Sequence, residues 1–256
     1  MDAESGKKLK SLLAAISSGG IVTSAKLSEL GISHGLARNY VTNGWLHRIG
    51  VGAYRRPHEN PTWQAAVHAL QTQLHLPVHV AALTALAAEG ARHYVRLSRD
   101  RVFLFSTPQK TSPPRWFNDH DWAADIVYTQ SKLLPEELGL RSLDFSGFPL
   151  NASSPERAIL ESLHLAPATI DLVECSHVLE GLLSLRPKLM QELLESCNSI
   201  KVRRLFLYLA TRSNLPVIKH LDLDRISLGS GARAIVPDGV YEARFQMMLP
   251  KELVMH

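Results

Sequence analysis

The chain has 256 residues, enough for one large or two modest domains, and 45% of them are hydrophobic, as in a soluble globular protein. No apolar run approaches the roughly 20 residues that span a bilayer, and the start of the chain has no signal-type apolar segment. We therefore expect a cytoplasmic protein. The net charge of +4 falls entirely within residues 1–60, whereas residues 61–256 carry 20 charges of each sign. This partition predicts that the N-terminal part alone attracts a polyanion.

The first elements of the chain predict a winged helix-turn-helix. A helix over Lys7–Ser17 and a short strand at Ile21–Val22 precede the stretch 24–56, which reads as helix, turn, helix and two-strand ribbon. Ser24 and Ser33 are predicted to cap the two helices of this stretch, because serine hydroxyls accept hydrogen bonds from first-turn N–H groups. Glycines that follow each helix can take the left-handed conformation and end it.

The second of these helices is predicted to pack one face and expose the other. Leu36, Ala37 and Tyr40 share one face at 3.6-residue periodicity. An α-helix fits the DNA major groove, where arginine pairs with guanine and asparagine with adenine. The candidate base-reading side chains on the other face and at its margins are Ser33, His34, Arg38, Asn39 and Thr42.

A hairpin, the wing, is predicted to follow the second helix. Trp45 and Leu46 are expected to return to the core, and residues 46–49 pair with residues 53–56 across a glycine-rich turn. Three arginines flank this hairpin, and their guanidinium groups could contact phosphates and fix the register of the protein on DNA. These candidate phosphate contacts are Arg48, Arg55 and Arg56.

Two prolines, Pro57 and Pro61, break regular structure and mark the predicted boundary between a DNA-binding domain (residues 1–57) and a second domain (residues 61–256). The fold class is therefore α+β, with a winged helix-turn-helix followed by a larger mixed α/β domain. In the second domain we predict helices over 62–75 and 78–89, strands over 93–97 and 102–106, a surface loop over 107–118, strands over 125–129 and 143–145, helices from 153, over 170–185, 187–196 and 201–212, and a closing hairpin within 218–250.

Two helices of the second domain carry specific predictions. Ser153 and Glu156 have the spacing of a capping box at a helix start. On the helix over 201–212, one face is apolar, and the opposite face carries the basic residues Lys201, Arg204 and Arg212. This basic face is either a contact surface for a partner or a solvated flank of a packed helix.

The sequence offers little catalytic chemistry. His75 and His79 have the spacing of two metal ligands on one helix, but Pro77 lies between them. The triplet 119–121, Asp-His-Asp, reads as a solvated turn, and neither a GxSxG elbow nor a phosphate-binding loop is present. The acids of the nuclease-like string 237–244 are too close in sequence to lie on separate strands. Cys175 and Cys197 read as reduced core thiols. We expect no catalytic residues, no metal and no cofactor.

Several strings of the chain resemble the AbiEi family, the antitoxins of type IV toxin–antitoxin and abortive phage-infection systems. The resemblance covers nearly the whole chain, and the strings after the wing are the most specific. They are NGWLHRIGVGAYRR (43–56), VHVAALTALAAEGARHYV (78–95), SSPERAILE (153–161), EGLLSLRPKLMQELLESC (180–197), KVRRLFLYLA (201–210) and LDLDRISLGSGAR (221–233).

The resemblance implies an N-terminal domain that represses the protein's own operon at inverted repeats of double-stranded DNA, and a C-terminal antitoxin domain. It also implies a nucleotidyltransferase-like toxin as the functional partner. Because the N-terminal charge excess is small, we expect two copies to pair cooperatively on DNA. Lys201, Arg204 and Arg212 are then the candidate antitoxin surface. Two alternatives stay open: a stand-alone regulator whose second domain senses a ligand or a protein, and a DNA-processing enzyme.

Overall fold

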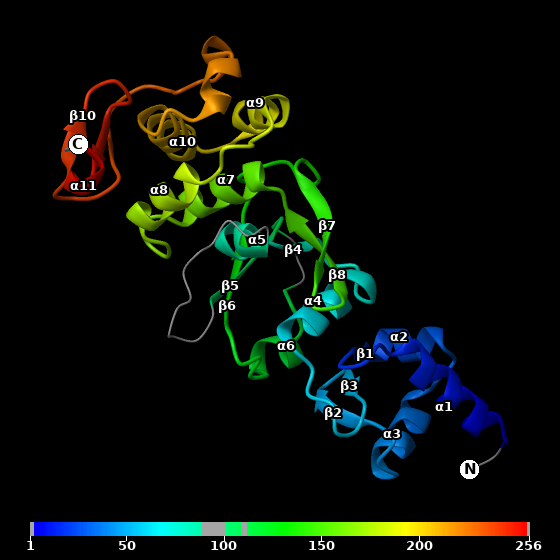
Figure 1. Cartoon of the computed structure of the whole chain (residues 1–256). Coiled ribbons are helices and arrows are strands. Elements are labelled where there is room, and N and C mark those ends of the chain that lie inside the picture. Colours follow the sequence, from blue (N-terminus) through cyan, green and yellow to red (C-terminus); the bar gives the residue numbers. More distant parts are fainter. Residues whose placement is uncertain (1–2, 89–100, 109–111, 255–256) are drawn as a thin grey trace.

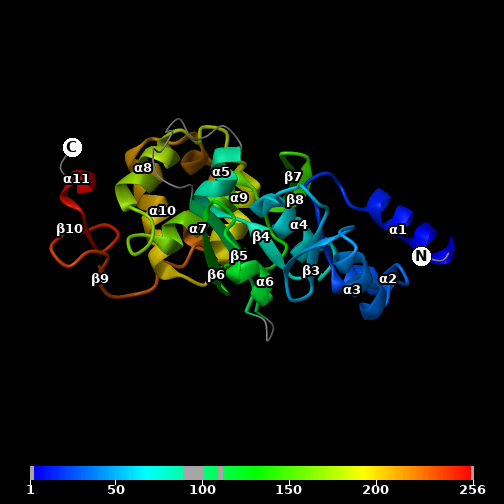
Figure 2. The same ribbon diagram turned by 90° about the horizontal axis from the view of Figure 1, so that it is seen from below.

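The computed structural model of the chain describes residues 3–88, 101–108 and 112–254. The described chain forms three parts in a row, with the N-terminus and the C-terminus at opposite ends (Figure 1, Figure 2). A winged helix comes first, a five-stranded sheet with helices on both faces lies in the middle, and a helical layer with a small three-stranded sheet comes last. The predicted α+β class is confirmed. Among the described residues, no helix is long and apolar enough to span a bilayer.

The N-terminal part has the predicted order of elements. Its strands pair antiparallel in the order β1-β3-β2, so that β1 lies beside the β2–β3 hairpin. The elements are α1 (Ala3–Ala15), β1 (Ile21–Thr23), α2 (Ser24–Glu29), α3 (His34–Thr42), β2 (His47–Gly50) and β3 (Ala53–Arg55). The buried residues of the core that they enclose are Leu9, Leu12, Ile16, Val22, Leu27, Ile32, Ala37, Tyr40, Leu46 and Tyr54.

The helix ends of this part agree with the prediction, except that one N-cap lies one residue earlier in the chain. Ser33 caps α3, because its hydroxyl oxygen accepts a hydrogen bond of 3.2 Å from an N–H of the first turn. The predicted cap at Ser24 is wrong by one residue, since Thr23 accepts the corresponding bond at the start of α2. Gly31 and Gly44 follow α2 and α3 with φ of 70° and 73°, the left-handed conformation expected for them.

The winged helix is packed against the middle of the molecule. Ile21 and Ala53 are buried in a core that they share with α4 (Trp63–Thr72) and the central sheet. Beyond the end of α4, the side chain of Gln73 pairs with the backbone of β1: it accepts from the N–H of Thr23 at 2.8 Å and donates to the carbonyl of Ile21 at 2.8 Å. This side chain covers part of the open edge of β1, so α4 and Gln73 fix the winged helix on the central part.

The central sheet has the strand order β6-β5-β4-β8-β7, with β5 parallel to β6 and β4 parallel to β8. Alternate residues of β5 face opposite sides: Val102 and Leu104 pack toward α4 and α6, whereas Phe103 and Phe105 pack toward α5 and α7. The elements are β4 (Val78–Val80), α5 (Ala82–Ala88), β5 (Arg101–Ser106), α6 (Arg115–Asp119), β6 (Asp125–Gln130), β7 (Leu140–Phe145) and β8 (Phe148–Ser153).

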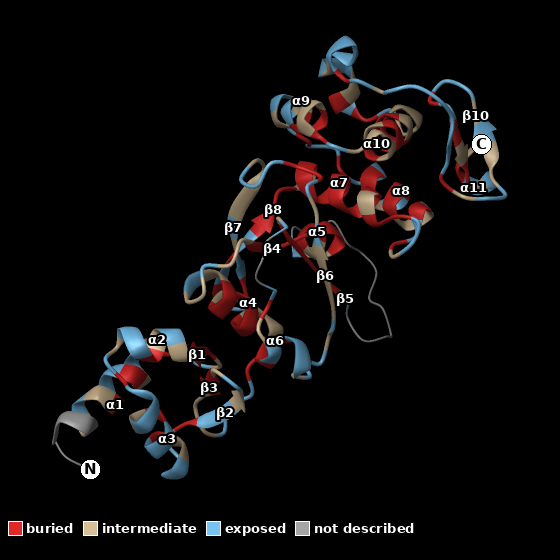
Figure 3. Ribbon diagram, turned by 180° about the vertical axis from the view of Figure 1, so that it is seen from behind, coloured by how far each residue is buried: buried red, intermediate tan, exposed pale blue. Residues whose placement is uncertain are grey.

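Four helices form the layer beyond the sheet, and α7 is the most buried of them (Figure 3). They are α7 (Pro155–Leu165), α8 (Leu172–Glu180), α9 (Pro187–Ser196) and α10 (Ile200–Arg212). The predicted capping box at α7 is wrong, because Ser154 is the N-cap residue and makes no side-chain capping bond. Ser153 donates instead to Glu161 at 2.7 Å, and Glu156 accepts three hydrogen bonds from Arg186.

The chain ends in a small sheet of order β10-β11-β9. The predicted closing hairpin corresponds to the antiparallel pair of β10 and β11, while β9 is parallel to β11. The elements of this segment are the 3-10 helices Pro216–His220 and Leu223–Arg225, then β9 (Arg233–Ala234), β10 (Val240–Glu242), β11 (Met247–Leu249) and α11 (Lys251–Val254).

Two predicted elements of the second domain are wrong. The helix over 78–89 is a strand followed by a helix, because Val78–Val80 pairs with β5 and β8 before α5 begins. The surface loop over 107–118 contains α6, whose Trp116 and Phe117 are buried. The strand predicted over 93–97 lies outside the described residues. The other predicted strands and helices are present with bounds shifted by a few residues.

Candidate nucleic-acid interface

The outer face of α3 is the best candidate for contact with a nucleic acid. Ala37 and Tyr40 anchor the inner face in the core, with exposed fractions of 2% and 1%. The residues predicted to read bases are all exposed, and the exposed positions of α3 are pale blue in Figure 3. The exposed residues are Ser33, His34, Arg38, Asn39 and Thr42. A helix that is fixed on one side and polar on the other meets the geometric requirement for groove reading.

The wing lies beside α3 and is short. Its tip is Val51, which is 77% exposed, and Gly52 turns the chain with φ of 89°. The carbonyl of Gly52 accepts a hydrogen bond of 2.9 Å from the N–H of Ser24, which holds the tip against the start of α2. Arg48 on β2 is exposed, as expected for a phosphate contact.

The two other wing arginines are half-buried and donate to main-chain carbonyls of the protein, and their contact with phosphates stays a prediction. Arg55 donates to the main-chain carbonyls of Glu59 and Arg56. Arg56 donates to the carbonyls of Leu13 and Ile16, at the C-terminal end of α1, and pairs with the Glu59 carboxylate at 3.6 Å. A cation at this end of a helix satisfies carbonyls that have no partner in the helix. These bonds hold both side chains against the module and leave them less available for a phosphate than Arg48.

Sequence reasoning missed one exposed aromatic side chain. Trp45 does not return to the core: it is 45% exposed and follows directly after α3, whereas its neighbour Leu46 is fully buried. Hydrophobicity alone predicted burial for both residues. The structure separates them because α3 ends at Thr42 and the turn that follows directs only Leu46 inward. Trp45 therefore borders the exposed face of α3 and joins the candidate interface.

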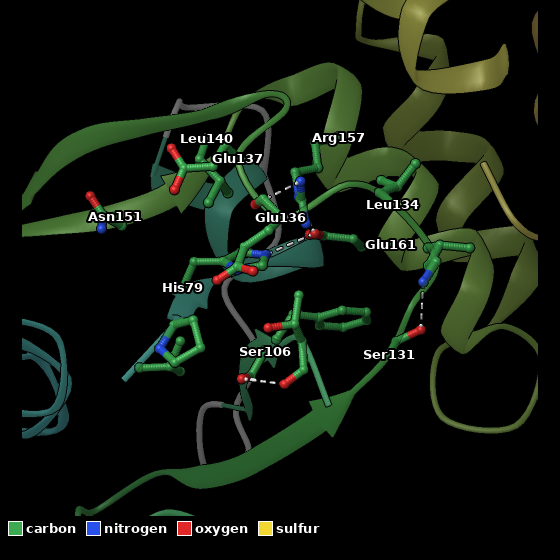
Figure 4. A pocket seen from close by; sticks show the side chains of 15 residues that line it. His79, Ser106, Ser131, Leu134, Glu136, Glu137, Leu140, Asn151, Arg157 and Glu161 are labelled. Atoms are coloured by element: carbon green, nitrogen blue, oxygen red, sulfur yellow. Dashed lines mark hydrogen bonds and ion pairs between the residues drawn. The ribbon is translucent and has the colours of Figure 1, made fainter. Parts of the chain in front are cut away.

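A second polar group of residues lies at the end of the sheet where the parallel strands β5 and β6 finish, around a cavity of about 80 Å³ (Figure 4). Its centre is the fully buried carboxylate of Glu161. This carboxylate accepts hydrogen bonds from Nε2 of His79 at 2.9 Å and from Nε of Arg157 at 2.8 Å. It also accepts from the hydroxyl of Ser153 and from the N–H of Ala82. The four donors come from β4, β8, α7 and the start of α5, so the carboxylate ties these elements together.

The charge state of Glu161 follows from these contacts. Burial by itself raises the pKa of this carboxyl group, but the charge and hydrogen bond of His79 and the cation of Arg157 lower the pKa more strongly, to about 2. Arg157 also donates to the carbonyls of Pro135 and Leu138, and thereby holds the connection between β6 and β7. The arrangement is that of a buried ionic cluster that joins the central sheet to α5 and α7.

Two serine hydroxyls line this cavity. The hydroxyl of Ser106 donates to the carbonyl of Thr107, and the hydroxyl of Ser131 lies 3.4 Å from the ring of His164. Within the described part of the chain, no group of three or more His, Cys, Asp or Glu side chains is placed to hold a metal ion. The two thiols, Cys175 and Cys197, are buried and free, as predicted, and burial raises the pKa of Cys175 to about 12.

Two family models match successive parts of the chain. The model described as the transcriptional regulator, AbiEi antitoxin N-terminal domain, matches residues 5–97. The model described as the transcriptional regulator, AbiEi antitoxin, type IV TA system, matches residues 99–250. The chain belongs to the AbiEi antitoxin family. The resemblance found in the sequence is thereby confirmed, together with its assignment to transcriptional regulators and antitoxins.

Among solved structures, the AbiEi chain is similar to the RV2827C protein from Mycobacterium tuberculosis. The TM-score is 0.59, the sequence identity is 15%, and the match covers 96% of this chain and 91% of that chain. This similarity shows the shared fold over nearly the full length of both proteins. No curated protein matches the chain.

The basic face predicted on α10 of this AbiEi protein is not a free surface. Arg204 is 2% exposed and donates to the carbonyls of Leu228, Gly231 and Gln246 at 2.8–3.2 Å, and to that of Gly229 at 3.4 Å. The prediction that Arg204 belongs to an exposed antitoxin surface is therefore wrong. The C-terminal segment covers this side of α10, and the loop that contains Gly229 wraps around the guanidinium group.

The two other residues of that face are also engaged. Lys201 is half-buried, and its Nζ donates to the carbonyls of His164 and Ala166 at the C-terminal end of α7, at 2.8 and 2.6 Å. Burial lowers the pKa of Lys201 below its usual range. Arg212 is half-buried and pairs with Glu180 at 3.8 Å. The three cations thus join α10 to neighbouring elements, and the assignment of Lys201 and Arg212 to an antitoxin surface stays a prediction.

Proposed function

We propose that the protein is the antitoxin of a type IV toxin–antitoxin system and represses its own operon by binding inverted repeats in the promoter. The observation that carries the repressor role is the exposed polar face of α3, fixed on a folded winged helix in a chain of the AbiEi family. Arg38 and Asn39 are the side chains on this face that suit bidentate contacts with guanine and adenine. The role is regulatory and neutralising, without catalysis, and is exercised in the cytoplasm.

The functional partner in this proposal is a nucleotidyltransferase-like toxin encoded beside the antitoxin gene. We assign the antitoxin activity to the part after the proposed boundary at residues 57–61, because the winged helix is the proposed DNA-binding part. The family assignment supports a toxin partner, while the balanced charge of residues 61–256 argues against DNA as the main partner of that part.

The proposed repressor binds as two copies, cooperatively, on one inverted repeat. With Arg55 and Arg56 engaged inside the protein, the winged helix offers fewer phosphate contacts than its sequence suggests. A module with few such contacts binds weakly at physiological salt, and a second copy compensates for this. Mobility shifts on one half-site and on the intact repeat distinguish cooperative from independent binding.

A two-part reporter strain tests the proposed function. The strain carries the protein's own promoter fused to a fluorescent reporter, and the neighbouring toxin gene under a separate inducer. Expression of the parental protein should lower reporter fluorescence and restore growth when the toxin gene is induced. Arg38→Ala should lose repression while growth rescue is retained, since the two activities belong to different parts of the chain. Unchanged fluorescence with the parental protein would contradict the repressor role, and unrestored growth would contradict the antitoxin role.

A further inference from the structure

The wing on its own offers few contacts to a DNA backbone. Of its three arginines, Arg48 alone is exposed, because Arg55 and Arg56 donate to carbonyls inside the protein. The tip of the wing is the apolar Val51, which is 77% exposed. A cation near the wing could contact the phosphates that flank the groove and fix the position of the protein on DNA.

The helix α6 of the second domain lies directly against the wing. If Gly50 carried a Cβ atom, that atom would lie 2.8 Å from the Cβ and 3.1 Å from the Cα of Trp116, so that only glycine permits this approach. Trp116 is 3% exposed and makes edge contacts with the rings of Phe117 and Trp122, with centroids 6.0 and 6.2 Å apart. The start of α6 is therefore held at a fixed position beside the wing.

The residue next to this contact is an exposed arginine. Arg115, the first residue of α6, is exposed, and it forms no hydrogen bond or ion pair with any residue that the structure describes. In Figure 2, α6 and α3 lie along the same edge of the molecule, with the β2–β3 hairpin between them. Arg115 lies at the end of α6 that contacts the wing, and Asp119 lies at the opposite end.

We propose that Arg115 contacts a DNA phosphate beside the wing and supplies, from the second domain, a contact that the wing arginines do not make. The inference rests on the proposed DNA binding and deepens it. The DNA-binding surface then extends from α3 across the wing to α6, and Gly50 and Trp116 set the position of Arg115 relative to the wing. A phosphate contact of this kind carries no sequence information, so Arg115 contributes affinity on every DNA sequence.

Salt titrations of binding test this inference. The probes are a fluorescent duplex of the protein's own upstream DNA and a duplex of scrambled sequence, with binding followed by anisotropy. Arg115→Gln should weaken binding to both duplexes by a similar factor and reduce the slope of log K against log salt by about one unit. The control is Arg233→Gln, which removes an exposed arginine from β9 at the far end of the molecule and should leave the slope unchanged.

A second variant tests the coupling between the wing and α6. Gly50→Ala should move the wing away from Trp116, and Arg115→Gln should then cause a smaller additional loss of affinity than it causes in the parental protein. Equal losses in the two backgrounds would show that the wing and Arg115 do not act as one surface. If the parental protein binds neither duplex, the proposed function fails as well. If the parental protein binds and Arg115→Gln keeps the parental slope, this inference alone is overturned.

Discussion

Replacing Glu161 with glutamine is expected to lower the free energy of unfolding by about 3–5 kcal/mol at neutral pH. The carboxylate is fully buried and balances the cation of Arg157, while it also accepts hydrogen bonds from His79 and Ser153. Glutamine keeps the size of the side chain but leaves the arginine without a counter-charge in the interior. Urea unfolding followed by circular dichroism measures the loss.

The same carboxylate predicts how stability depends on pH. The pKa of Glu161 is about 2 in the folded protein and near 4.5 in the unfolded chain, so its contribution is complete above about pH 5. That contribution is lost as the pH falls from about 4.5 toward 2, and the difference between the parental protein and Glu161→Gln should shrink over this range. Glu137→Gln, at an exposed position on the same cavity, is the control and should change stability by under about 0.5 kcal/mol. A Glu161→Gln variant as stable as this control at pH 7 would refute the structural role.

Replacing Arg204 with methionine is expected to destabilise the protein by about 3–5 kcal/mol, with the loss concentrated in the C-terminal segment. The guanidinium group is buried and satisfies four main-chain carbonyls of residues 228–246. Methionine has a similar length but no donor, so these carbonyls would lose their partners without access to water. Urea unfolding and hydrogen exchange of residues 233–249 measure the global and the local effect.

Arg203→Met is the matched control for Arg204→Met, because Arg203 is the neighbouring residue on α10. Among the residues that the structure describes, Nε of Arg203 has no hydrogen-bond partner, and this arginine is half-buried. The control should change stability by under about 0.5 kcal/mol. The stability of Arg204→Lys should lie between those of Arg203→Met and Arg204→Met, because lysine keeps the charge but lacks the several N–H donors of the guanidinium group. Equal stability of Arg203→Met and Arg204→Met would contradict the proposal that Arg204 holds the C-terminal segment through its hydrogen bonds.

The parts of the fold that the sequence predicted well depend on local interactions. The cap at Ser33, the buried spacing of Ala37 and Tyr40, and the left-handed glycine after α3 all act within a few residues of one another. Such interactions leave a direct pattern in the chain. For this reason the sequence alone predicts the order of elements in the winged helix and the exposed face of α3.

The parts that the sequence predicted poorly depend on contacts between distant segments. Periodicity identified the apolar side of α10, but it could not show that residues 228–246 cover the other side and bury Arg204. The inward orientation of Arg56 depends on the carbonyls at the end of α1, 40 or more residues earlier. Val78–Val80 forms a strand because it pairs with β5 and β8, although the sequence pattern predicted a helix over these residues. Tertiary context decides each of these cases.

The contact between Gly50 and Trp116 is another feature that the sequence did not predict. The glycine is part of the wing and the tryptophan follows a proline-rich stretch, and neither sequence pattern points to the other. A signal did exist in retrospect, because three large apolar rings within residues 116–122 are unusual for an exposed loop. That cluster brings α6, and with it Arg115, to the candidate DNA-binding surface.

The central claim is that the exposed face of α3 reads the protein's own operator, and Arg38→Ala tests it most directly. Anisotropy titrations at one salt concentration compare the parental protein and this variant on the upstream duplex and on a scrambled duplex. The variant should lose about 1–3 kcal/mol of specific binding and keep its affinity for the scrambled duplex, because a bidentate contact to guanine is removed. If Arg38→Ala keeps the parental preference for the upstream duplex, α3 does not read bases through this residue and the account is contradicted.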